Sequence, residues 1–170
     1  MFRTHALIAL VFLVSVLATP NAFAKEQIFQ EFSCDLPEGW DGTERMGFLT
    51  RDREEYMLTL GLKDEAEENY LAFISLYLLP NKPGKNSEDS AKALAKEQAD
   101  ASEPVQKGPY WVFTGNPRDK TLPGLATTYV TSNKDSLLII IAKDPSMRGA
   151  DKIIQSVRPQ STRAKALLTK

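Results

Sequence analysis

The sequence predicts an α+β fold, an antiparallel β-sheet of six to seven strands with helices packed on its faces. Two apolar runs carry this prediction, at residues 70–80 (YLAFISLYLLP) and 137–142 (LLIIIA). Successive side chains of a strand point to opposite faces, so apolar residues at consecutive positions need cover on both sides. Helical patterns in mid-chain and near the C-terminus supply that cover. We therefore expect residues 70–80 to form the central strand.

Three strands are expected before the central one. Residues 32–36 (FSCDL) alternate between apolar and polar and lead into a turn at residues 37–40 (PEGW). Residues 43–50 form the second expected strand and residues 55–63 the third. One face of this third strand is apolar and contains Tyr56, Leu58, Leu60 and Leu62.

The mid-chain helix follows a Pro-Gly loop at residues 81–86. Asn86 or Ser87 can cap it, because a side-chain oxygen at this position accepts a hydrogen bond from a free backbone N–H group. The helix is expected to end at Glu103-Pro104. Its stripe repeats with helical spacing and is built from Ala91, Leu94, Ala95, Gln98 and Ala99.

The second half predicts a short aromatic strand at residues 109–114, a ten-residue loop at 115–124 and a hairpin of residues 125–132 and 136–143. Asp144 and Pro145 then predict the N-cap and first turn of a second helix. Arg158-Pro159 is expected to stop this helix. Its apolar stripe contains Met147, Ala150, Ile153, Ile154 and Val157.

Residues 1–24 have the pattern of a signal peptide. Arg3 precedes an apolar run at residues 6–18, and Ala22-Phe23-Ala24 supplies small residues for cleavage after Ala24. The run has 13 residues, fewer than the about 20 that a membrane-spanning helix needs. An anchor that is never cleaved stays the alternative. We expect a periplasmic or secreted protein with no transmembrane segment after cleavage.

The remaining chain is expected to form one domain at residues 25–159. Removing 24 of the 170 residues leaves 146, enough to bury a core. Residues 160–170 form a basic C-terminal tail, which either frays or makes one more helical turn.

Charge is balanced in total and uneven along the chain. The part after residue 24 has 20 basic and 22 acidic residues, which predicts no nucleic-acid partner and no binding to an anionic membrane. Residues 25–103 have a net charge of −9, whereas residues 105–170 have +7. If strands of both halves share one sheet, the charges intermix. If they do not, the molecule is strongly dipolar and suits a charged partner.

Cys34 is the single cysteine of the chain, which excludes an intramolecular disulfide. Such a cysteine is either a reactive thiol or a small buried apolar residue. Its position between Phe32 and Leu36 on the same face of an expected strand favours burial.

Three segments resemble the PsbP-like α/β/α sandwich family, which includes thylakoid-lumen PsbP proteins and bacterial envelope proteins of the DcrB type. They are Phe32-x-x-x-Leu36-Pro37-x-Gly39-Trp40, Ser90-Ala91-x-x-Leu94-Ala95 and Ile153-Ile154-x-Ser156-Val157-x-Pro159. The resemblance implies a non-catalytic partner or accessory factor of a larger assembly. It implies no catalytic residues, because the family shares no catalytic motif. Nothing marks a photosynthetic member, so a generic envelope protein is expected.

The residue content disfavours an enzyme. His5 is the only histidine and belongs to the expected signal peptide, which excludes histidine triads, histidine zinc sites and histidine general bases from the remaining chain. We expect no cofactor. A cation site remains open at the acidic loop, although its spacing matches no calcium loop. Its carboxylates are Asp64, Glu65, Glu67 and Glu68.

These observations favour a secreted or periplasmic, non-catalytic binding or accessory protein with an envelope protein partner. The alternative is a small-ligand or divalent-cation binding protein. The loop at residues 115–124 is the candidate partner-binding segment, because adjacent strands are usually joined by about 2–5 residues. Its candidate contact residues are Arg118, Lys120 and Leu122. A tolerated insertion without a role explains the loop length equally well.

Overall fold

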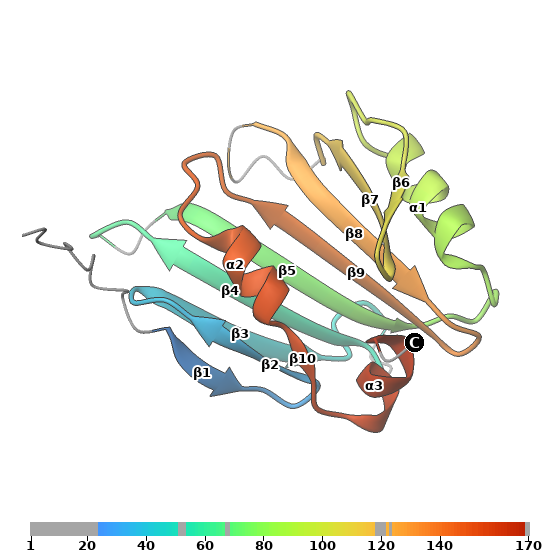
Figure 1. Cartoon of the computed structure of the whole chain (residues 1–170), viewed down its shortest axis with the longest axis horizontal. Helices are drawn as coiled ribbons and strands as arrows, with labels where there is room; N and C mark the ends of the chain where they lie inside the picture. Colours follow the sequence, from blue (N-terminus) through green and yellow to red (C-terminus); the bar gives the residue numbers. More distant parts are fainter. Residues whose placement is uncertain (1–23, 51–53, 67–68, 118–121, 123, 169–170) are drawn as a thin grey trace, which may run out of the picture.

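The structure, a computed structural model, describes residues 24–50, 54–66, 69–117, 122 and 124–168. Its largest element is an antiparallel seven-stranded sheet, which confirms the α+β class (Figure 1). The strands lie in the order β3 (Trp40–Met46), β4 (Tyr56–Lys63), β5 (Tyr70–Pro80), β9 (Ser136–Lys143), β8 (Ala126–Ser132), β7 (Tyr110–Gly115) and β6 (Val105–Lys107).

A second, three-stranded sheet covers one face of the large sheet. It contains β1 (Lys25–Ile28), β2 (Phe32–Leu36) and β10 (Arg158–Pro159). The strand at residues 32–36 was therefore predicted correctly, but the expectation of a single sheet was wrong. Together with α2 (Ala150–Ser156) and α3 (Thr162–Leu168), this small sheet encloses the main core.

Strand β5 has the predicted bounds and lies inside the large sheet, between β4 and β9. Ile74, Leu76 and Leu78 are fully buried and point into the main core. The side chains at the alternate positions point to the opposite face, where Phe73 and Ser75 are also buried. The two predicted apolar runs are direct neighbours, because β5 pairs with β9 over eight residues.

α1 (Ser87–Lys96) covers the opposite face of the sheet at β7 and β8 (Figure 1). The side chain of Asn86 accepts a hydrogen bond from the backbone N–H of Asp89, as its expected role as a cap requires. The helix ends at Lys96, earlier than predicted. The backbone of Ala99 instead pairs with Asn116, which draws the chain into the sheet edge.

Two boundaries of the first half differ from the prediction. The strand expected at residues 43–50 runs from Trp40 to Met46, so Trp40 begins a strand rather than ending a turn. Its ring is buried against α2, and the indole N–H donates to the backbone oxygen of Arg148.

The second helix begins later than the sequence predicts. Its N-cap is Gly149, in the left-handed conformation, so Asp144 and Pro145 lie in the connection before it. Met147, expected in the buried stripe, is 92% exposed. Arg158 and Pro159 do end this helix, but they also pair with β2 as β10. The basic tail contains α3, whose Ala164 and Leu167 are buried in the main core.

The acidic first half and the basic second half of the chain contact each other through ion pairs outside the large sheet. The strands do not interleave, because β3, β4 and β5 fill one side of the large sheet and the later strands fill the other. The segments outside this sheet cross over. Arg158 pairs with Glu26 and Asp35, and Arg163 pairs with Glu31, so basic groups from the second half neutralise acidic groups of the first.

Candidate functional site

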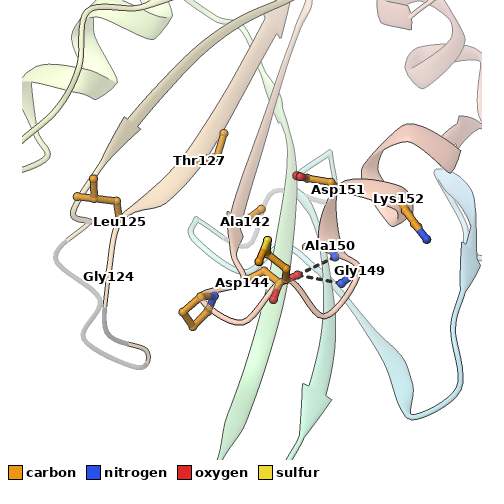
Figure 2. A pocket seen from close by; sticks show the side chains of 11 residues that line it. Gly124, Leu125, Thr127, Ala142, Asp144, Gly149, Ala150, Asp151 and Lys152 are labelled. Atoms are coloured by element: carbon orange, nitrogen blue, oxygen red, sulfur yellow. Dashed lines mark hydrogen bonds between the residues drawn. The ribbon is translucent and has the colours of Figure 1, made fainter.

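A pocket lies where β8 begins and β9 ends, beside the start of α2 (Figure 2). Its volume is about 380 Å³. The large sheet supplies Thr127 and Ala142, and α2 supplies residues of its first turn. The lining residues are Gly124, Leu125, Thr127, Ala142, Asp144, Pro145, Met147, Gly149, Ala150, Asp151 and Lys152.

Asp144 organises the wall of this pocket. Its Oδ1 accepts a hydrogen bond from the backbone N–H of Arg148 at 2.7 Å. Its Oδ2 accepts from the N–H groups of Gly149 and Ala150, each at 3.0 Å, as the dashed lines of Figure 2 show. The carboxylate therefore satisfies the free N–H groups at the start of α2 from outside the helix. This end of the helix is already occupied by a negative group.

The connection held by Asp144 presents an apolar side chain to solvent. Met147 has a φ of 52°, a left-handed conformation that few residues other than glycine adopt. Its side chain is 92% exposed, and Leu125 on the other side of the pocket is 55% exposed. Asp151 and Lys152 add charged groups to the same rim. The pocket thus combines exposed apolar groups with a polar border, as protein-binding surfaces do.

The candidate loop leads into this pocket. Gly124 and Leu125 line the pocket, and Leu122 lies just before them. Arg118 and Lys120 fall outside the described residues. Leu122 is only 9% exposed, so its side chain is an anchor of the loop rather than an accessible contact.

Lys143 holds the loop at Leu122 and was not identified from the sequence. It is 1% exposed, and its Nζ donates a hydrogen bond to the backbone oxygen of Leu122. The single sequence signal for it was a charged residue at the end of an apolar run. Because β9 pairs with β5, Lys143 lies beside Phe73 and fastens the loop to the face of the sheet opposite the main core.

Cys34 is buried in the main core, which decides between the two alternatives for it. Burial is the largest effect that raises the thiol pKa to about 12, and the nearby Asp35 carboxylate adds to it. A nucleophilic cysteine needs a thiolate. At neutral pH the Cys34 thiol is therefore protonated, and the residue serves as a small apolar side chain of the core rather than as a nucleophile.

Asp64 and Glu65 of the acidic loop belong to the described residues. Asp64 accepts hydrogen bonds from the backbone and side-chain N–H groups of Asn69, which closes the turn between β4 and β5. Glu67 and Glu68 lie outside the described residues. Within the described ranges, no three His, Cys, Asp or Glu side chains come close enough together to hold a metal ion.

A second pocket, of about 580 Å³, lies beside α3. Glu31 and Arg163 form its charged wall, with 3.0 Å between Glu31 Oε1 and Arg163 Nη2. Ser161 also donates to Glu31, and Arg163 donates to the backbone oxygen of Glu54. These groups are engaged in fastening α3 to the β1–β2 connection, so they serve the fold.

Among the described residues, no helix is both long and apolar enough to cross a membrane. Comparisons with protein-family models, curated proteins and solved structures found no match to this chain.

Proposed function

We propose that the protein is a non-catalytic binding or accessory module of the cell envelope, similar to the PsbP-like family, and that it binds a protein partner at the pocket between Leu125 and Met147. The signal-peptide pattern of residues 1–24 supports the envelope location. The segments from Phe32 to Trp40 and from Ile153 to Pro159 support the family resemblance.

One observation carries the proposed site: Met147 is exposed although its backbone is tightly fixed. A methionine with 92% exposure loses apolar contacts that the core could provide. Asp144 nevertheless holds the connection in place through three backbone hydrogen bonds. A flexible thioether on a rigid turn adapts to the shape of an apolar partner side chain while little backbone order is lost on binding.

The test is capture of an envelope partner by cross-linking. We expect Leu125→Ser with Met147→Ser to reduce capture strongly and to leave the thermal midpoint nearly unchanged, because both side chains are exposed. Val105→Ser is the matched control, since Val105 is 50% exposed on β6, outside the pocket. Unchanged capture by the double variant would place the partner site elsewhere.

The envelope location has its own test. Intact-mass measurement of protein extracted from the producing cells is expected to show a chain that begins at Lys25. A mass that retains residues 1–24 would instead identify a membrane-anchored form, the alternative to cleavage.

A small apolar ligand is the second candidate for the same pocket, because a volume of about 380 Å³ lies within the usual range for ligand sites. A ligand at a hundred times its Kd stabilises a protein by about 2.7 kcal/mol. Thermal unfolding with a panel of small apolar compounds and with calcium therefore distinguishes this function from protein binding. A shift that Met147→Ser abolishes would favour the ligand.

A further inference from the structure

β3 forms one edge of the large sheet and is the longest edge strand among the described residues. It pairs with β4 over seven residues. Five of its seven residues are exposed, from Asp41 to Met46 with Gly42 partly covered. The other edge strands are shorter: β6 has three residues, β1 four and β10 two. The outer side of β3 therefore offers a row of backbone groups for pairing with another strand.

The sequence of β3 is complementary to itself about Thr43. In an antiparallel pair of two β3 strands centred on this residue, Thr43 lies opposite Thr43. Asp41 then lies opposite Arg45 of the second copy, and the two-fold symmetry repeats this pair. Trp40 lies opposite Met46 at both ends. The same operation on β1 places Lys25 opposite Ile28, and on β6 places Val105 opposite Lys107, so neither has this complementarity.

These two charges have no mutual contact within one molecule. Asp41 and Arg45 are four residues apart on the same face of a strand, a separation of about 13 Å at 3.3 Å per residue. None of the ion pairs between described residues includes either of them. Across an antiparallel pair, directly opposite side chains are about 5 Å apart at Cβ and interact.

We propose that a second copy of this chain binds at β3 through antiparallel pairing centred on Thr43. The two seven-stranded sheets then form one continuous sheet across the dimer. This inference is independent of the proposed partner pocket, because none of the residues that line that pocket belongs to β3. The occupant is a second copy because the charge complementarity is between β3 and itself.

Apolar groups beside the edge add to this surface. Met46 on β3 is 40% exposed. The ring of Phe29 lies against Gly42, where an added Cβ would come within 2.5 Å of it. Ile28, the residue before Phe29, is 70% exposed. In the dimer, the two-fold axis places the same face of both sheets on the same side. The groups beside β3 in one molecule therefore lie next to the same groups of the second copy.

Charge reversal tests the register. Sedimentation experiments at protein concentrations up to about 1 mM, which detect even weak interfaces, are expected to show a dimer of the wild-type protein. Asp41→Arg or Arg45→Asp alone places like charges opposite each other twice and should weaken dimerisation roughly tenfold. Asp41→Arg with Arg45→Asp restores opposite charges and should restore the dimer. The matched control, Glu88→Lys with Lys92→Glu on α1, exchanges an ion pair far from β3 and should have no effect.

A monomeric wild-type protein at all concentrations would overturn the proposal. So would single variants that dimerise as well as the wild type, or a double variant that stays as weak as the singles. Circular dichroism of each variant confirms that it is folded.

Disulfide cross-linking tests the symmetry axis directly. Thr43→Cys places two thiols opposite each other, at a Cα separation that a disulfide can span. Oxidation should give a covalent dimer. Thr59→Cys is the control, because Thr59 pairs with Thr43 from β4, one strand further inside. The native Cys34 does not compete, since it is buried. Equal cross-linking of both variants would contradict the proposed pairing.

Discussion

The ring of Tyr70 lies directly over Gly61 of the neighbouring strand. A Cβ at Gly61 would be 2.2 Å from Tyr70 Cε1, closer than non-bonded atoms allow. We therefore expect Gly61→Ala to destabilise the protein by about 1–3 kcal/mol, the usual effect of inserting a group into filled space. Urea unfolding measures the change.

The same substitution behaves differently when the ring is absent. In a Tyr70→Ala background, Gly61→Ala should change the free energy of unfolding little, because the position of the clash is empty. The two changes should thus be strongly non-additive. Additive effects would mean that Gly61 is required for another reason, such as the register shift that β4 and β5 show near Leu62.

Asp144→Ala removes an acceptor from three backbone N–H groups at the start of α2. We expect a loss of about 1–2 kcal/mol in the free energy of unfolding, similar to the loss of a side-chain acceptor at a helix N-terminus. Amide hydrogen exchange should accelerate at residues 148–150. Asp151→Ala is the control, since Asp151 lies in the same helix turn and makes none of these three bonds. Equal effects of both variants would show that negative charge alone is responsible.

Arg163→Met should destabilise the protein by about 2–3 kcal/mol, because it leaves the Glu31 carboxylate buried without its cation. The Glu31 side chain is 8% exposed and that of Arg163 is 24% exposed. Adding Glu31→Gln to Arg163→Met removes the buried charge and should recover most of the stability. Thermal unfolding at one pH compares the variants. A double variant less stable than Arg163→Met would argue that hydrogen bonds to Glu31 matter more than its charge.

Stability should fall at alkaline pH, partly through Cys34. The folded thiol pKa is raised to about 12 from an unfolded value of 9.0. Below pH 9 the thiol is protonated in both states and its titration has no effect. Between pH 9 and 12 only the unfolded thiol loses its proton, so stability falls by up to about 1.4 kcal/mol per pH unit.

Cys34→Ala removes this contribution and should flatten the first part of the alkaline slope. Tyr110, whose pKa burial also raises to about 12, retains its own contribution to this slope above pH 10.

In the native wild type, a thiol reagent should label Cys34 slowly, because the side chain is buried, and in denaturant it should label it fast. Equal rates in both conditions would contradict the burial of this residue.

Local patterns predicted the elements that depend on their own sequence. The strand at residues 70–80 has the predicted bounds because apolar groups on both faces leave no other environment for it. Asn86 caps α1 as expected, because the cap forms within one helical turn. The hairpin of β8 and β9 is also local, closed by hydrogen bonds from Asp135 and Ser136 to the side chain of Asn133.

The features that the sequence did not predict depend on partners far along the chain. β10 has two residues, and only its pairing with β2 makes it a strand. α3 is held by a contact between residues 31 and 163, which no local pattern contains. Met147 fits a helical stripe in the sequence. Asp144, however, accepts hydrogen bonds from the N–H groups of residues 148–150. The helix therefore begins only at Ala150, and Met147 lies before it with its side chain in solvent.

The pairing of β5 with β9 sets the order in which the chain can fold. Phe73 pairs with Lys143, 70 positions later, so one edge of β5 stays open until β9 has been made. Synthesis at about 5–20 residues per second takes about 3–13 s to cover residues 80–143. During that interval the strand with the longest apolar run of the protein has an unpaired backbone edge, the feature by which incompletely folded chains pair with one another and aggregate.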